Sequence, residues 1–137
     1  MLYYKNIIRK NPKTEQQLHY ATLVSPQPVS RERIIERIEK KCTLSSADVK
    51  AVLDALEFEL IDFLQEGCSV RLGDVGTFRL SISSAGATKP EDVKAGLIRG
   101  TRVVYTPSTA MRRRLSVKGG LKFARWTPEA AAEATQP

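Results

Sequence analysis

The sequence predicts an α+β protein in which two helices are followed by a β-hairpin and a further strand. Helical patterns fill most of residues 30–66 and end before Gly67. The stretch CSVRLGDVGTFRLSI, at 68–82, then alternates apolar and polar residues on both sides of a glycine-bounded turn. Alternation with period two is typical of a half-buried strand, because successive side chains leave opposite faces. A lone hairpin is at best marginally stable, so the rest of the chain is expected to cover its apolar face.

Residues 1–29 are predicted to be an N-terminal extension that contains two strands. Apolar, aromatic-rich segments at 2–8 and 18–24 flank the polar linker NPKTEQQ. Asn11-Pro12 favours a turn between these segments. The sequence SPQP at 25–28 then interrupts regular structure before the first helix.

Each of the two helices has an expected start signal. Ser30 is expected to cap a helix that runs to about Lys41, with its isoleucines on one face. Ser45-x-x-Asp48 resembles a capping box for a second helix that ends near Glu66. Gly67 suits the position after that helix, where the left-handed conformation is common. The main apolar stripe of the second helix comprises Val49, Val52, Leu53, Leu56, Leu60, Phe63 and Leu64.

The second helix is apolar on more than one face. Phe58 lies opposite the main stripe, and Ile61 lies beside it. Such a helix must be covered on more than one side, by the N-terminal strands or by another subunit, unless these are scattered surface residues. We predict a homodimer whose interface includes Val52, Leu56, Phe58, Ile61, Phe63 and Phe78.

An arm is expected from Ser83 to Arg102, after the hairpin. Pro90 could begin a short helical turn in PEDVKAGL or mark the bend of an extended arm. A third strand is predicted at 103–105 and a basic helix at 109–117, TAMRRRLSV. The main domain is thus placed at 30–117, a possible short strand within 118–126, and a disordered tail at 127–137.

The positive charge of the chain is unevenly distributed along the sequence. The net charge is +7, but residues 30–66 carry nine acidic and six basic side chains. Residues 101–126 carry seven basic side chains and no acidic one. A segregated basic region suggests a polyanionic partner, although a basic surface that only aids solubility is the simpler alternative.

The residue types favour neither catalysis nor membrane insertion. The chain has one histidine, His19, and no nucleophile–base pair, metal-ligand cluster or phosphate-binding glycine loop is recognisable. We expect no enzyme activity, no cofactor or metal, and no small-molecule substrate. Cys42 and Cys68 are interpreted as small buried thiols. No apolar run is long enough to span a membrane and no secretory signal is evident, so a cytoplasmic location is expected.

Two motifs resemble the HU/IHF family of bacterial DNA-architectural proteins. GCSVRLGDVGTF at 67–78 is similar to the family's entry into its sheet. VYTPS at 104–108, followed by MRRRL at 111–115, looks like the family's C-terminal signature. The resemblance covers about residues 30–115, and the N-terminal extension resembles the HU-like branch common in Bacteroidetes-type bacteria. It implies an intertwined homodimer with helices under a saddle of strands, and arms that reach around nucleoid DNA and kink it from the minor groove.

The arm departs from the family pattern, which is rich in Arg and Lys with a wedging proline at the tip. Here Pro90 is followed by Glu91 and Asp92, whose carboxylates repel phosphates, so a rigid turn is favoured over a wedge. The main hypothesis is a non-enzymatic, histone-like protein that binds the phosphate backbone or minor groove of duplex DNA without sequence preference. Whether it also bends the DNA is left open. The alternatives are an HU-like protein-interaction module and an RNA-binding variant. Predicted DNA contacts are Arg71, Arg79, Lys89, Pro90, Lys94, Arg99, Arg102, Arg112, Arg113 and Arg114.

Overall fold

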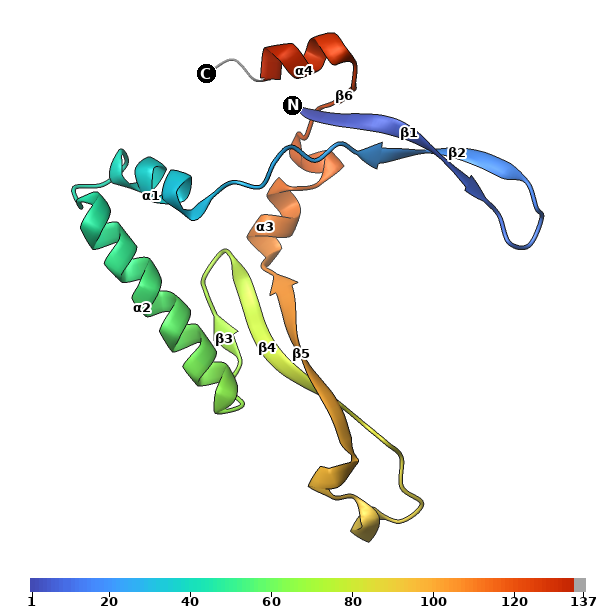
Figure 1. Ribbon diagram of the computed structural model, residues 1–137, viewed down its shortest axis with the longest axis vertical. Coiled ribbons are helices and arrows are strands. Elements are labelled where there is room, and N and C mark those ends of the chain that lie inside the picture. The colour runs from blue at the N-terminus through green and yellow to red at the C-terminus, as the bar shows by residue number, and fades with distance from the viewer. Residues whose placement is uncertain (135–137) are drawn as a thin grey trace. The chain divides into compact units, whose positions relative to one another are not determined.

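The computed structural model describes residues 1–134 and shows an α+β fold (Figure 1). The chain forms two compact units, and each is described separately. One contains residues 1–28 together with the chain from Arg113 onward, and the other contains residues 29–112.

The first unit contains a three-stranded sheet with strand order β2-β1-β6. Strands β1 (Leu2–Lys10) and β2 (Gln17–Leu23) form the antiparallel pair predicted for the N-terminal extension. Strand β6 (Phe123–Arg125) lies within the segment 118–126, where a possible short strand is expected, and pairs in parallel with the start of β1. That pairing joins the two ends of the chain and was not predicted from the sequence.

The C-terminal segment differs from the sequence-based prediction at two places. Helix α3 (Thr109–Arg114) ends before the predicted residue 117, because Ser116 is extended and its hydroxyl caps a separate 3₁₀ turn at Val117–Gly119. The expectation of a disordered tail at 127–137 is wrong for 128–134, where helix α4 (Pro128–Ala134) forms. The Thr127 hydroxyl accepts a hydrogen bond from Ala130 N at the start of α4. The rest of that predicted tail, 135–137, lies outside the described residues.

The second unit begins with the two predicted helices, α1 (Arg31–Glu39) and α2 (Ser46–Gln65). The Ser30 hydroxyl accepts a hydrogen bond from Arg33 N, as expected for an N-cap. Ser45 and Asp48 form the predicted capping box, and the hydrogen bonds from Ser45 hold the pKa of the Asp48 carboxyl below its usual value. Gly67 follows α2 with φ +83°, so the predicted end of the helix is confirmed.

The second sheet contains β3 (Val70–Arg71), β4 (Gly76–Ser84) and β5 (Ile98–Pro107) in that order, all antiparallel. The predicted hairpin is confirmed, but β4 and β5 extend further than expected, into the predicted arm. The irregular part of the arm is therefore 85–97, closed by a hydrogen bond of 2.8 Å from Ala85 N to Leu97 O. It contains 3₁₀ turns at Pro90–Asp92 and Ala95–Leu97, so the turn at Pro90 is confirmed.

Few apolar side chains are buried within a single chain. Ile35, Val49 and Leu64 are the buried hydrophobic residues of the part that the structure describes. Ile35 belongs to α1, and Val49 and Leu64 belong to α2, the helix that contacts α1 and strands β3 and β4. Cys42 and Cys68 are both exposed in the chain, so their interpretation as buried thiols is wrong. Burial of the remaining apolar surface requires a second surface from outside this chain or from its other unit.

A glycine at the start of β4 is expected to be essential for folding. Gly76 has φ +135°, and a Cβ there would overlap Thr106 O and lie 2.9 Å from the Tyr105 ring. Gly76→Ala should lower the free energy of unfolding by more than about 1 kcal/mol, because it adds strain and a clash. Gly86→Ala is the control, since Gly86 has open space around its Cβ position. Chemical denaturation of both variants checks the difference, and equal stability would contradict this account.

Candidate nucleic-acid interface

The register of the second sheet separates apolar from basic side chains. Residue pairs Val70–Phe78 and Phe78–Tyr105 lie opposite each other across the three strands. Because opposed residues share a face and neighbours along a strand alternate, Leu80, Ile82 and Val103 belong to this same face. The apolar face therefore comprises Val70, Phe78, Leu80, Ile82, Val103 and Tyr105.

The opposite face of the same sheet carries three arginines. Arg71 is opposed to Thr77 on β4, Arg79 to Val104 on β5, and Arg102 to Ser81. Thr77, Arg79 and Ser81 are every second residue of β4, so their side chains leave the same face, and the residues opposed to them leave that face too. Arg71, Arg79 and Arg102 therefore share one face. Arg79 and Arg102 are diagonal neighbours, which in antiparallel sheets lie about 7–8 Å apart. We call these three side chains the arginine face.

Contacts on the apolar face position the turn before β4 and the start of α3. The rings of Phe78 and Tyr105 lie 5.1 Å apart between centroids. The Tyr105 hydroxyl donates a hydrogen bond of 2.6 Å to Val75 O and lies 2.8 Å from Met111 Sδ. The Ser108 hydroxyl donates to Asp74 O at 2.5 Å and accepts from Met111 N. These bonds fix the first turn of α3 against the glycine-bounded turn, a role for Tyr105 and Ser108 that the sequence analysis missed.

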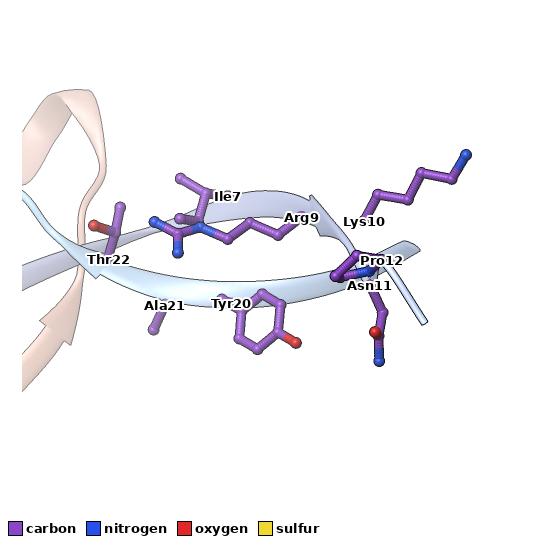
Figure 2. A pocket seen from close by; sticks show the side chains of 8 residues that line it. All are labelled: Ile7, Arg9, Lys10, Asn11, Pro12, Tyr20, Ala21 and Thr22. Carbon is purple, nitrogen blue, oxygen red and sulfur yellow. The ribbon is translucent and has the colours of Figure 1, made fainter. Parts of the chain in front are cut away.

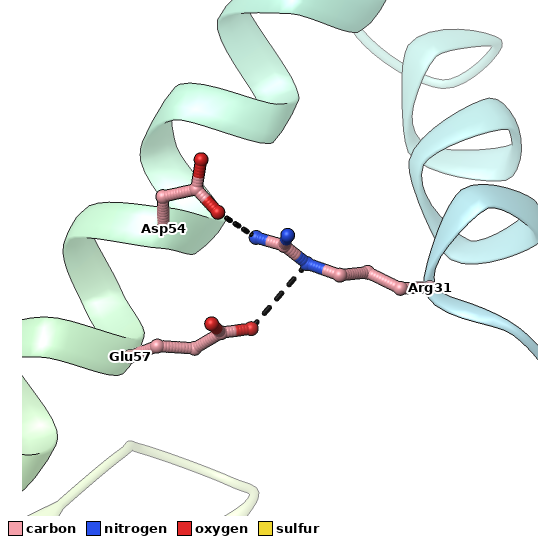
Figure 3. A network of polar contacts seen from close by, with 3 residues as sticks. All are labelled: Arg31, Asp54 and Glu57. Carbon is pink, nitrogen blue, oxygen red and sulfur yellow. Dashed lines mark hydrogen bonds and ion pairs between the residues drawn. The ribbon is translucent and has the colours of Figure 1, made fainter.

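The arginine face has no acidic partner among the side chains that the structure describes. Its three arginines are exposed, and the ion pairs of those described side chains form only at Arg31 and Lys40. Arg31 shows the contrasting case, because its guanidinium contacts Asp54 and lies 3.3 Å from Glu57 on α2 (Figure 3). The hydrogen bond to Asp54 raises the pKa of Arg31 above its usual value. Arg31 thus links α1 to α2, whereas the charges of the arginine face remain available to an anion.

The arm supplies cations and carboxylates close together. Lys89 and Lys94 are exposed and precede the two 3₁₀ turns. Pro90 occupies the first position of its turn, followed by Glu91 and Asp92. Arg99 is the extra residue of a β-bulge, since Ser83 pairs with Gly100 and Ser84 with Ile98. The arm therefore has a weaker net positive charge than the arginine face, despite its three cations.

Helix α3 contributes a separate basic group. Arg112, Arg113 and Arg114 are consecutive and exposed. Successive residues of a helix point about 100° apart, so the three side chains spread over most of one turn. Together with the arginine face and the arm, they account for every predicted DNA-contacting residue, and all except Pro90 carry a positive charge.

The predicted dimer residues are largely unburied in the single chain. On α2, Phe58 is 69%, Val52 59%, Ile61 58% and Phe63 45% exposed. Leu56 is also exposed, and Phe78 is half-buried under Tyr105. The helix therefore presents an extensive apolar surface that the chain's own second unit leaves uncovered.

No metal-binding cluster is found in the part of the chain that the structure describes. A membrane-spanning helix is likewise absent from residues 1–134, since none is sufficiently long and apolar.

The helix pair, the three-stranded sheet and the arm define a domain of the HU type. The family of HU domains fused to a winged helix-turn-helix domain, an immunoglobulin-like domain or a glycine-rich motif matches residues 1–123, and the chain belongs to this family. The resemblance inferred from the sequence motifs is therefore confirmed. A comparison with curated proteins gives no match.

A solved structure shares the fold at low sequence identity. It is described as a candidate bacterial DNA-binding protein from Bacteroides vulgatus ATCC 8482, with a TM-score of 0.63 and 16% identity. The alignment covers 93% of this chain and 49% of that one, so this chain spans about half the length of its neighbour.

The Tyr105 hydroxyl is expected to stabilise the domain that carries the arginine face. Tyr105→Phe keeps the ring beside Phe78 but removes the hydrogen bond to Val75 O. A loss of about 1 kcal/mol in the free energy of unfolding is expected, the usual contribution of one such bond. Tyr20→Phe is the control, because that exposed hydroxyl has no hydrogen bond among the described residues. Denaturation curves that coincide for Tyr105→Phe and the wild type would refute the assignment.

Proposed function

We propose that this protein is a non-enzymatic, histone-like DNA-binding protein that contacts the phosphate backbone of duplex DNA. The observation that carries the proposal is the arginine face, on which three guanidinium groups share one side of a sheet and form no ion pair with the side chains that the structure describes. Arginine binds phosphate oxygens with paired N–H donors and remains charged at all physiological pH values. Membership of an HU-domain family agrees with this function.

Binding is proposed to tolerate different DNA sequences. The side chains opposed to the arginines, Thr77, Ser81 and Val104, are short, so the arginines are the long cationic groups of this face and can be neutralised by the phosphates of any sequence. Phosphate contacts position a protein on DNA but carry no sequence information. Affinity should therefore depend on salt far more than on sequence.

The arm is proposed to add to affinity without acting as a strong wedge. Pro90 starts a 3₁₀ turn, and Glu91 and Asp92 in that turn would be repelled by nearby phosphates. Lys89, Lys94 and Arg99 offset this repulsion. We propose that any bending of DNA results mainly from wrapping around basic surfaces, including α3, and that the protein associates with the nucleoid.

The protein is also proposed to act as an intertwined homodimer with no stable folded monomer. Three buried hydrophobic residues are too few to stabilise a folded domain, whereas α2 exposes apolar residues on more than one face. A second copy would cover these faces and bring together two arginine faces. Residues 1–29 are proposed to be an extension of this HU-like domain, which is placed at 30–117.

The proposed phosphate contacts predict a specific change in salt dependence. Arg79→Ala combined with Arg102→Ala should flatten the slope of log K against log salt by about two units, since each contact contributes about 0.9. The loss of affinity should be similar on unrelated duplexes of equal length. Arg33→Ala combined with Arg37→Ala, which removes two exposed arginines of α1, is the matched control. Titration of labelled duplexes with each protein gives the slopes.

Two outcomes would contradict the DNA-binding proposal. One is a slope of log K against log salt that is the same for the wild type, the Arg79/Arg102 double variant and the Arg33/Arg37 control. The other is the absence of duplex binding by the folded wild type at ~50 mM salt, where phosphate contacts are strongest. The interaction-module alternative would then be favoured, with the acidic turn of the arm as a candidate contact.

The proposed dimer predicts a strong effect at Phe58. Phe58→Asp should weaken self-association on the order of tenfold or more, because a charge would replace, in both subunits, an aromatic side chain that is 69% exposed in the single chain and that the proposed dimer would bury. Glu59→Asp places the same new residue one position away and controls for helix propensity. Analytical ultracentrifugation over a range of concentrations measures both variants. A wild-type monomer that remains folded at nanomolar concentration would overturn the proposal.

A further inference from the structure

The sheet of the first unit gathers aromatic and basic side chains that the proposed duplex site does not use. Residues 1–29 and 113–126 contain five of the nine Phe, Trp and Tyr residues of the chain. Four basic residues precede β2, and Glu15 is the one acidic residue of the first 29. Among the described residues, none of these four cations forms an ion pair. The four cations are Lys5, Arg9, Lys10 and Lys13.

Tyr20 lies at the centre of this surface. It is 47% exposed and is opposed to Ile7 across the β1–β2 pair. It lines a hollow of about 690 Å³ together with Ile7, Arg9, Lys10 and Asn11 (Figure 2). Figure 2 shows the Arg9 guanidinium on the same strand as Ile7, with the Tyr20 ring on the neighbouring strand.

A second hollow adjoins Tyr20. It has a volume of about 390 Å³ and is also lined by Tyr4, Asn6, His19 and Arg125. The Asn6 amide donates to His19 Nδ1 at 3.0 Å, which orients the imidazole ring. By the strand register, Tyr4, Asn6 and His19 lie on the sheet face opposite the Tyr20 ring, so this second hollow is separate from the one that the ring shares with Ile7 and Arg9.

We propose that this hairpin surface is a second nucleic-acid site, which binds single-stranded DNA with Tyr20 as a stacking platform. Aromatic rings beside a cationic groove are the usual means of holding unpaired bases and their phosphates. Arg9 shares the sheet face of Tyr20 and Ile7, so its guanidinium supplies the charge beside the ring, and Ile7 extends the apolar surface there. Lys10 alternates to the other face at the end of β1 and adds a cation at the border of the same hollow. Stacking and phosphate contacts need no 2′-hydroxyl, so DNA supplies all the required groups.

The surface fits a single strand better than a duplex or a protein. Bases in a duplex are stacked on one another and cannot lie against a tyrosine ring, whereas unpaired bases can. A protein partner would need carboxylates to match the uncompensated cations and would leave the polar hollows without a specific occupant. The hairpin belongs to the first unit and the arginine face to the second, so the two proposed sites share no residue and can be tested with separate variants.

The test uses the full chain and a labelled oligo-dT of about 12 nucleotides, within the usual site size of such surfaces. Binding is followed by fluorescence anisotropy at ~50 mM salt. Tyr20→Ala should weaken oligo-dT binding by about 5- to 100-fold, the range for loss of one stacked base. Tyr20→Phe keeps the ring and should bind like the wild type. Duplex affinity should be unchanged in both variants.

A second hairpin variant, and a variant of the other site as a control, test the proposal even if Tyr20→Ala disturbs folding. Arg9→Ala combined with Lys10→Ala should flatten the salt slope for oligo-dT by about 1.4 units, since each contact on a single strand contributes about 0.7. Arg79→Ala combined with Arg102→Ala should weaken duplex binding and leave oligo-dT binding within about twofold.

Three results would overturn the proposal. The wild type could fail to bind oligo-dT, or the hairpin variants could bind it with wild-type affinity and slope. Alternatively, Tyr20→Ala could change self-association in ultracentrifugation without changing oligo-dT binding, which would identify the hairpin as a protein interface. Duplex binding by the Arg79/Arg102 variant tests only the proposed duplex site. Its outcome does not change the conclusion drawn from oligo-dT binding to the hairpin.

Discussion

The antiparallel pairing of β4 with β5 is the constraint on which the second unit depends. Its register opposes Phe78 to Tyr105 and sets Arg79 diagonal to Arg102. Because side chains alternate along each strand, the same hydrogen bonds place aromatic residues on one face and arginines on the other. A slip of one residue would exchange the faces and place guanidinium groups among apolar side chains. Gly76, at the start of β4, permits this pairing because no side chain fits between it and Thr106.

The proposed assembly and the proposed DNA site are linked through this arrangement. The apolar face, together with α2, offers more surface than one chain can cover, and Ile35, Val49 and Leu64 are the only buried hydrophobic side chains in the part of the chain that the structure describes. Pairing of two chains would cover that surface and leave the arginine faces exposed. The ion pairs of Arg31 show how this chain neutralises a structural arginine with Asp54 and Glu57. The absence of such partners around Arg79 and Arg102, within the described residues, is therefore informative about function.

Local signals in the sequence predicted the helices and the hairpin. Features that depend on contacts between residues far apart in the sequence could not be predicted. Ser30, Ser45 and Gly67 marked helix ends because each acts on backbone groups a few residues away. Alternation predicted the shared face of Arg71 and Arg79, and the motifs at 67–78 and 104–108 predicted the family. The parallel pairing of β6 with β1 joins residues over a hundred positions apart, so no local pattern showed it. The exposure of Cys68 and the proposed stacking role of Tyr20 likewise depend on what surrounds these residues in three dimensions.

The central claim is that strand register presents Arg71, Arg79 and Arg102 to the phosphates of duplex DNA. The most direct measurement is an NMR titration that follows the arginine Nε–Hε signals of the full chain as a mixed-sequence duplex is added at low salt. The account predicts that the signals of these three residues shift together, and that the signal of Arg31, held by Asp54 and Glu57, stays in place. Stationary signals from all three, with the protein folded and the duplex in excess, would contradict it.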